Sequence, residues 1–182
     1  MLTPALFLSG WYPLSAILWA YDWELPERVI ATSTTLNTVD TIVACSGVLY
    51  FSGGRIGFFD CGCTRAHRSQ YEIVGDAGSI RVDDLVGGQG RTGNFAAYET
   101  PFVGSSSYTQ GDVMGKDEVV QAEPCDHVNE LTSAFASCVQ AVLEGGKPDP
   151  DWPRRSLAVH TVMSAVFESA VAGGIPVEVN AA

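Results

Sequence analysis

The order of strands and helices along this chain is the feature that most constrains its fold. Stretches rich in Val, Ile, Thr and aromatic residues, which favour strands, fill much of the first half, at residues 27–35, 41–51, 55–64 and 69–84. Turns containing glycine, at Ser52-Gly53-Gly54 and at Gly75-Asp76-Ala77-Gly78, predict two β-hairpins. At least four antiparallel strands are therefore expected before the chain reaches its midpoint.

Two helices are predicted in the second half. The first begins at a capping Asp126, ends at Gly145-Gly146 and carries apolar residues at helical spacing, namely Val128, Leu131, Phe135, Cys138 and Val142. The second runs from near Pro153 to Gly173-Gly174, and its apolar residues cover so much of its circumference that we expect it to be sandwiched between layers. A last strand is expected at 175–179. Strands followed by helices predict an α+β fold, a large, mainly antiparallel open β-sheet with helices packed on one face.

The chain opens with an apolar stretch that has no charged residue between Met1 and Asp22. Its length would suit a membrane-spanning helix, which needs about 20 apolar residues. Prolines, serines and a glycine interrupt it, and the basic start of a signal peptide is missing. We therefore expect a short buried helix from about Tyr12 to Tyr21, with Pro13 in its first turn. A membrane tether through residues 2–21 remains an alternative.

Size, charge and cysteine content narrow the classes of function. A length of 182 residues suits one domain, so we expect a single domain over 1–182, with 87–116 as a long surface excursion that holds one strand near 94–100. The formal charge of −11 repels phosphate backbones and argues against nucleic-acid binding. The five cysteines are scattered and contain no Cys-x-x-Cys pair, which predicts reduced thiols in a cytoplasmic protein.

Two strings imitate ligand-binding motifs. Cys61, Cys63 and His67 could suggest a metal, but on a strand the two cysteines would share a face and line the core, and no fourth ligand follows, so we expect no metal site. His127 and His160 are expected to be surface or packed residues. The string Gly88–Gly93 fits Gly-x-Gly-x-x-Gly, but the segment before Pro101 is too short for the helix that a dinucleotide loop requires.

Three segments in this order resemble a known family. They are "GWYPLSAILWAYDWELPERVIA", "GGRIGFFDCGCTRAHRSQYEIVGDAGSIRVDD" and the stretch from His127 to Val179. Together they resemble the C-terminal domain of Gfo/Idh/MocA oxidoreductases, particularly the branch similar to dihydrodiol dehydrogenase and its plant relatives. Residues 1–9 diverge from that pattern. The resemblance implies an open sheet whose exposed face joins subunits into a homo-oligomer, preceded by a nucleotide-binding domain. It also implies hydride transfer between NAD or NADP and a sugar, polyol or dihydrodiol.

The resemblance also implies where the chemistry occurs. Family members carry an Asp-x-Gly-x-Tyr or Asp-x-Gly-x-x-x-His type motif at the start of this domain's first helix, close to the nicotinamide. Gly10 and Tyr12 match that motif, Trp11 lies between them, and Leu8 occupies the place of the aspartate. Reducing a carbonyl requires a proton donor within hydrogen-bond reach, and Tyr12 is the candidate catalytic residue, with Gly10 and Trp11 facing substrate or cofactor. The family's lysine belongs to the preceding domain, and Lys147-Pro148 is not its equivalent.

A Rossmann domain is not expected before Gly10, since nine residues cannot form one. The chain alone is therefore expected to bind no nicotinamide nucleotide and to be inactive. Three hypotheses follow: a substrate-binding and oligomerisation domain of an oxidoreductase, a non-catalytic dimerisation or interaction domain, and a membrane-tethered protein.

Overall fold

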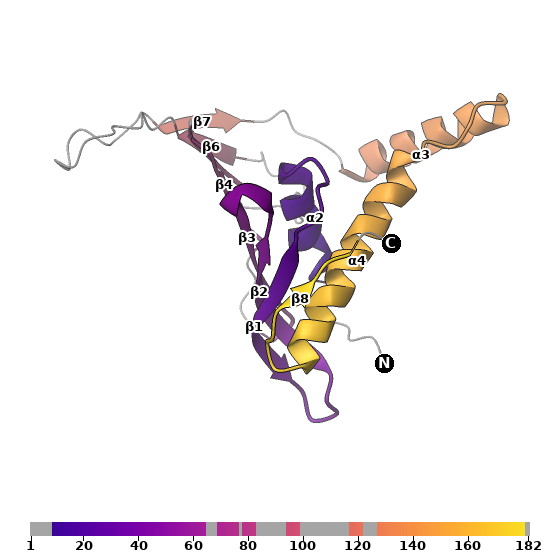
Figure 1. Ribbon diagram of the computed structural model, residues 1–182. Coiled ribbons are helices and arrows are strands. Elements are labelled where there is room, and N and C mark those ends of the chain that lie inside the picture. Colours follow the sequence, from indigo (N-terminus) through magenta and orange to yellow (C-terminus); the bar gives the residue numbers. More distant parts are fainter. Residues whose placement is uncertain are drawn as a thin grey trace. The chain divides into compact units, whose positions relative to one another are not determined.

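Helices and antiparallel sheets form this chain, as a computed structural model shows for residues 9–64, 69–76, 78–82, 94–98, 117–121 and 127–180 (Figure 1). In chain order the elements are α2 (Trp11–Ala20), β1 (Arg28–Leu36), β2 (Ile42–Tyr50), the short 3-10 turn η1 (Ser52–Gly54), β3 (Ile56–Gly62), β4 (Tyr71–Val74), β5 (Ser79–Val82), β6 (Asn94–Tyr98), β7 (Asp117–Gln121), α3 (His127–Leu143), α4 (Asp151–Val171) and β8 (Val177–Glu178). The predicted α+β class is confirmed.

The chain divides into two units. The first comprises residues 1–66 and 149–182, and the second comprises residues 67–148. The described strands form two four-stranded sheets, β3-β2-β1-β8 in the first unit and β4-β5-β6-β7 in the second. The sequence predicted one large sheet. Strand propensity indicates which segments are extended but not which strands pair, so it could not show the division into two sheets.

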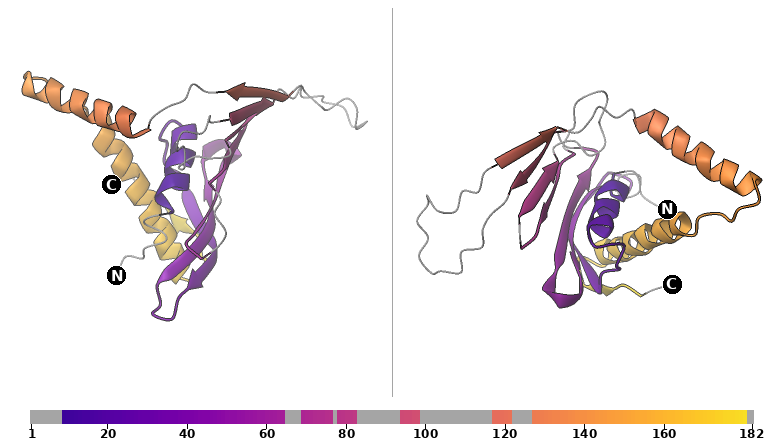
Figure 2. Two further views of the ribbon diagram at one scale, coloured as in Figure 1. Left: turned by 180° about the vertical axis from the view of Figure 1, so that it is seen from behind. Right: turned by 90° about the horizontal axis from the view of Figure 1, so that it is seen from above.

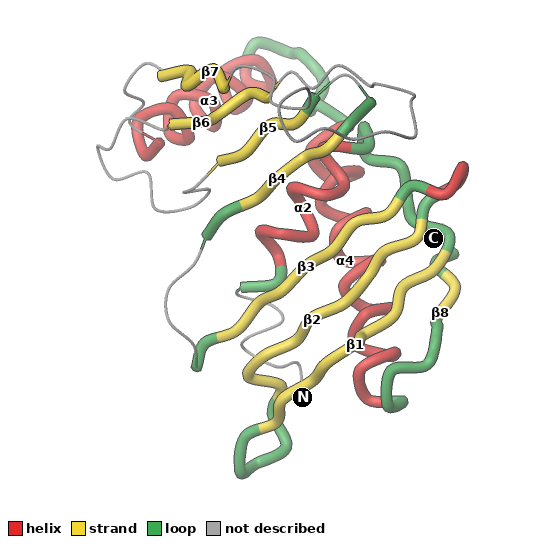
Figure 3. The backbone as a smooth tube through the Cα atoms, turned by 90° about the vertical axis from the view of Figure 1, so that its left-hand side faces the viewer, coloured by secondary structure: helices red, strands yellow, loops and turns green. Residues whose placement is uncertain are grey.

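The first unit has two layers, its sheet and the helices α2 and α4 on one face (Figure 2). The hairpin predicted at Ser52-Gly53-Gly54 is present, since β2 pairs with β3, and β1 also pairs with β2, all antiparallel (Figure 3). The expected terminal strand, β8, pairs with β1 at Arg28 and Val29. Along β3, exposed and buried residues alternate, so that every second side chain enters the core.

The core of this unit lies between the sheet and the two helices. Its fully buried members come from every layer and include Leu14, Leu18, Val29, Leu49, Val162 and Val166. Helix α2 packs closely on β3 at Gly57, where an added Cβ would lie 2.6 Å from Cγ2 of Ile17. A side chain at position 57 would therefore push the helix off the sheet.

A buried serine joins α4 to the sheet beside the turn that leads into β8. Ser169 Oγ donates a hydrogen bond to the carbonyl of Ile175 at 2.6 Å and accepts one from the N–H of Ala31 at 2.9 Å. Ala31 lies two residues beyond the β1 residues that pair with β8, next to a register shift in β1. In the same turn Gly174 has φ of +87°, and a Cβ there would lie 2.7 Å from the Ala31 carbonyl oxygen. The contact thus depends on a hydroxyl at 169 and on no side chain at 174.

Helix α4 departs from the prediction of a sandwiched helix. Val159, Val162, Met163 and Val166 are buried, as expected, but the face with Ser156, His160, Ser164 and Glu168 is exposed. Leu157 is also 55% exposed. Small and apolar residues extend around the helix, yet a polar residue at every fourth position keeps one stripe in solvent, and this spacing sets the buried side.

The second unit contains the other predicted hairpin. β4 and β5 pair in antiparallel register, and the turn between them is closed by a hydrogen bond from the N–H of Gly75 to the carbonyl of Gly78 at 2.8 Å. β6 confirms the strand expected near 94–100. The other residues of the expected excursion, 87–93 and 99–116, lie outside the described residues. α3 is the predicted helix, with Leu131 and Phe135 about 70% exposed. Its expected cap, Asp126, lies outside the described residues.

The apolar start of the chain forms a short helix, as predicted. α2 has ten residues, from Trp11 to Ala20, one residue earlier than the predicted bounds, and its Leu14 and Leu18 are buried in the core. Within the described parts of the chain, no helix combines the length and apolar character needed to cross a bilayer.

Replacing Ser169 with alanine is expected to destabilise the first unit by about 1–3 kcal/mol, because the buried N–H of Ala31 loses its acceptor. Urea denaturation followed by circular dichroism measures the change. Ser164→Ala, an exposed serine on the same helix, is the control and should stay within about 0.5 kcal/mol of the wild type. Equal stability of the two variants would contradict the role given to Ser169.

Candidate functional site

The three residues proposed from the sequence lie together at the start of α2. Gly10 precedes the helix and is buried, Trp11 is half-buried, and Tyr12 is 47% exposed. Pro13 occupies the first turn, where its missing N–H costs no hydrogen bond. No side chain caps this end, and the first turn holds no acidic residue. The exposed phenol of Tyr12 therefore lies beside the uncapped end of a helix.

The packing of α2 decides that Tyr12 points outward. Leu14 and Leu18 are buried and Ile17 contacts Gly57, so this side of the helix faces the sheet and α4. Tyr12 and Trp19, which is 57% exposed, lie seven residues apart and share the opposite side. Tyr12 is exposed because the apolar spacing of the helix places its neighbours Leu14 and Leu18 in the core.

Two side-chain contacts flank the start of α2. Ser9 Oγ lies 3.7 Å from Cys63 Sγ, at the end of β3. The indole ring of Trp11 meets the imidazole of His160 on α4 edge to face, with ring centroids 5.0 Å apart and an interplanar angle of 62°. Residues from three parts of the chain thus meet around Gly10.

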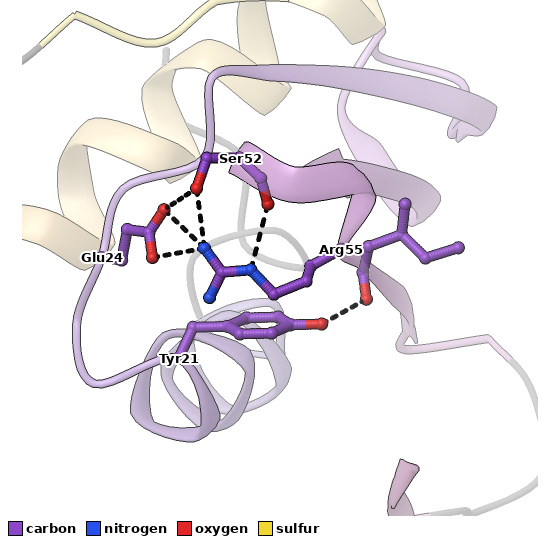
Figure 4. Close-up of polar contacts among 5 residues, drawn as sticks. Tyr21, Glu24, Ser52 and Arg55 are labelled. Atoms are coloured by element: carbon purple, nitrogen blue, oxygen red, sulfur yellow. Dashed lines mark hydrogen bonds and ion pairs between the residues drawn. The ribbon is translucent and has the colours of Figure 1, made fainter. Parts of the chain in front are cut away.

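A charged cluster holds the other end of α2 against the β2–β3 turn (Figure 4). The Arg55 guanidinium donates to both carboxylate oxygens of Glu24, at 2.9 and 2.7 Å, and lies over the Tyr21 ring at 5.2 Å from its centroid. Ser52 Oγ also donates to Glu24, at 2.9 Å, and the Tyr21 hydroxyl donates to the carbonyl of Ile56 at 2.8 Å. The hydrogen bonds from Arg55, and then from Ser52, lower the pKa of Glu24.

The chain beyond α2 makes a second contact with α4. Arg155 of α4 lies over the Trp23 ring, 5.3 Å from its centroid. Asp22 and Trp23 have positive φ, +52° and +64°, a conformation that costs energy for residues other than glycine. The N–H of Trp23 bonds back to the carbonyl of Leu18 at 2.6 Å. The ring contact and this hydrogen bond offset that cost.

The possible metal string separates in space. Cys61 is buried beside Cys45, its cross-strand partner, and burial raises the pKa of the Cys61 thiol to about 12. Cys63 is exposed, which corrects the expectation that both cysteines line the core. β3 ends at Gly62, so the alternation of strand faces no longer applies at Cys63. His67 lies outside the described residues, and across the described ranges no group of three potential metal ligands occurs.

Other sequence expectations have different outcomes. Leu8 and the string Gly88–Gly93 lie outside the described residues, and the side chain of His127 is not described. Lys147 is exposed in the segment between α3 and α4. His160, expected to be a surface or packed residue, lies on the exposed stripe of α4 with its ring against Trp11. The four-residue spacing of Ser156, His160 and Ser164 was the available signal that His160 belongs to that stripe.

Comparison with solved structures identifies the fold. The chain is 19% identical to a 3-ketoreductase from Actinomadura kijaniata, solved with NADP and TDP-benzene; the match covers 91% of this chain and 45% of that one, with a TM-score of 0.65. It is 15% identical to an aldose-aldose oxidoreductase from Caulobacter crescentus, solved with glycerol, over 95% of this chain and 47% of that one, with a TM-score of 0.66. This chain shares its fold with part of these oxidoreductases.

The neighbours are oxidoreductases of the Gfo/Idh/MocA type. The chain spans about half the length of the solved structures that it matches. No protein-family model matches it.

The stability that the Glu24 carboxylate contributes is expected to disappear in acid. Because the pKa of Glu24 is lower in the folded state than its ordinary value of 4.5, the contribution is fully present above pH 4.5 and is lost as the pH falls through the lowered value. Urea unfolding at a series of pH values should therefore show a gap between wild type and Glu24→Gln that closes in acid.

Glu27→Gln is the control for this experiment. Glu27 is exposed and lies three residues after Glu24 in the sequence, and its substitution removes the same formal charge. A gap between Glu24→Gln and wild type that stays constant down to pH 2 would contradict the role of the Arg55 and Ser52 hydrogen bonds.

Proposed function

We propose that this chain is the C-terminal substrate-binding and oligomerisation domain of an NAD(P)-dependent oxidoreductase of the Gfo/Idh/MocA type, similar to dihydrodiol dehydrogenase. Its substrate is a sugar, polyol or dihydrodiol whose hydroxyl-bearing carbon exchanges a hydride with the nicotinamide. The observation that carries the proposal is the exposed Tyr12 at the start of α2, in a fold shared with two oxidoreductases.

Tyr12 has the chemistry that the proposal requires. A phenol can donate a proton to a carbonyl oxygen as it becomes a hydroxyl, and can accept the proton in the reverse direction. The hydroxyl must approach substrate oxygen to within hydrogen-bond distance, which the 47% exposure of Tyr12 allows. Gly10 and Trp11 complete the turn that presents the phenol.

The described residues do not by themselves fit a nicotinamide nucleotide. All described strand pairs are antiparallel, whereas the dinucleotide fold requires parallel strands joined through a helix. The isolated chain is therefore proposed to bind neither NAD nor NADP, and to contribute only the side on which substrate binds.

A second candidate function is association without catalysis, and the outer face of the first sheet favours it. This face, opposite the helices, exposes Phe58 by 67% and Ile56 by 42%. Their cross-strand partners, Val48 and Tyr50, are only partly buried. Arg28 lies over the Tyr50 ring at 4.5 Å and supplies a polar edge. An apolar centre with a polar rim suits a homo-oligomeric contact.

The catalytic proposal is tested by nucleotide binding and turnover. NADH and NADPH fluorescence titrations should show no binding by the purified chain. The chain mixed with the part of the Actinomadura kijaniata ketoreductase that it does not match should oxidise NADPH with one or more members of a panel of ketoses, inososes and related ketones. Tyr12→Phe should lower that rate by about 10²–10⁴-fold, the usual contribution of a proton donor.

Tyr50→Phe is the matched control, because Tyr50 lies on the outer sheet face and should leave turnover unchanged. A rate that Tyr12→Phe does not alter would remove Tyr12 from the mechanism. If no substrate is reduced while the chain still self-associates, the association function replaces the catalytic one.

Association through the outer face is expected to depend on Phe58. Phe58→Asp places a charge at the centre of the apolar face, so sedimentation velocity should show the wild type as an oligomer and the variant as a monomer at the same concentration. Leu157→Asp, at an exposed position of α4, should sediment as the wild type does. A monomeric wild type, or an oligomer that tolerates Phe58→Asp, would contradict this assembly.

A further inference from the structure

His160 lies far from Tyr12 in the sequence, but its ring contacts Trp11, the residue that precedes Tyr12. The His160 imidazole meets the Trp11 indole edge to face, at a centroid distance of 5.0 Å. Trp11 directly precedes Tyr12 in the first turn of α2. The two residues that form the contact come from different helices, so the contact is made only in the folded first unit.

The side of α4 that carries His160 is fixed by the core. Val159, Val162 and Met163, which surround His160 in the sequence, are at most 1% exposed. Ser169, further along the same helix, is hydrogen-bonded to β1 and to the following turn. The backbone of His160 is therefore held by packing, which places its ring beside Trp11.

The first turn of α2 lacks the usual means of fixing a helix start. Gly10 provides no capping side chain, and no acidic residue follows in the first turn. Leu14 anchors this turn in the core, and two further contacts are made by side chains at the start of the helix, from Ser9 to Cys63 and from Trp11 to His160. Of these, an edge-to-face ring pair has a preferred geometry, whereas a sulfur–hydroxyl contact at 3.7 Å is weak.

We infer that His160 is a positioning residue for Tyr12 and acts through the Trp11 ring. The imidazole fixes the indole, the indole fixes the first turn of α2, and that turn sets the direction of the exposed phenol. The chemical importance of this direction rests on the proposed function of Tyr12. The link from His160 through Trp11 to the first turn of α2 does not depend on that function. Trp11 thereby serves as a support for the site and not only as a surface that faces a ligand.

The link is tested by fluorine NMR of the whole chain labelled with 3-fluorotyrosine. Six tyrosines give the spectrum, and comparison with Tyr12→Phe assigns the Tyr12 resonance. His160→Ala should shift that resonance by more than its linewidth, while His160→Phe, which retains an aromatic edge, should restore the wild-type position. Ser164→Ala, one turn further along the exposed stripe of α4, should leave it unchanged.

A second comparison separates action through Trp11 from a general loss of structure. In a Trp11→Ala background, His160→Ala should produce no additional shift, because the ring that transmits the effect is missing. The inference is overturned if the Tyr12 resonance ignores His160→Ala, if the shift persists in the Trp11→Ala background, or if His160→Phe does not restore the signal. Circular dichroism verifies that each variant is folded, as the exposure of His160 leads us to expect.

The measurement uses no nucleotide and no substrate, so it does not depend on turnover. A chain that fails the NADPH experiment can still show the coupling, in which case the inference survives and the catalytic role falls. If the chain turns over substrate but His160→Ala does not shift the Tyr12 resonance, the catalytic role survives and the inference about His160 falls.

Discussion

The hydroxyl of Ser169 is the contact on which the arrangement of the first unit depends. It joins the N–H of Ala31 in β1 to the carbonyl of Ile175 before β8, and it does so from the buried side of α4. A buried N–H without an acceptor costs free energy, so the hydroxyl fixes how far α4 slides along the sheet. This contact acts together with the buried Val159, Val162 and Val166, which hold the same side of α4 on the sheet.

Helix α2 is held at both ends by the same two neighbours. At its start, Trp11 meets His160 of α4 and Ser9 meets Cys63 after β3. Beyond its end, Trp23 meets Arg155 of α4, and Tyr21 with Glu24 meets Arg55 just before β3. A ten-residue helix has little stability of its own, so these contacts and the buried leucines hold it in place.

This arrangement explains how a short helix can present a reactive group. Tyr12 is exposed because Leu14 and Leu18 occupy the core, and its neighbour Trp11 packs against that core and against the ring of His160. The charged cluster around Glu24 lies at the opposite end and takes no part in presenting the phenol.

The sequence by itself predicted most of the described secondary structure of this protein, although not the strand β7. Strand-forming residues broken by glycine turns predicted the hairpins, and apolar spacing predicted α3 and α4, because these depend on neighbours within a few residues. It also placed Gly10, Trp11 and Tyr12 at the start of a helix. Their roles stay predictions until nucleotide binding and turnover are measured.

Only the tertiary structure decided the rest. The grouping of strands into two sheets, the exposure of Cys63 and the exposed stripe of α4 depend on which elements pack together. The contact between Trp11 and His160 joins residues on two helices at opposite ends of the sequence. Local spacing carries no information on such a pair, because the two helices meet only when both pack on the same sheet.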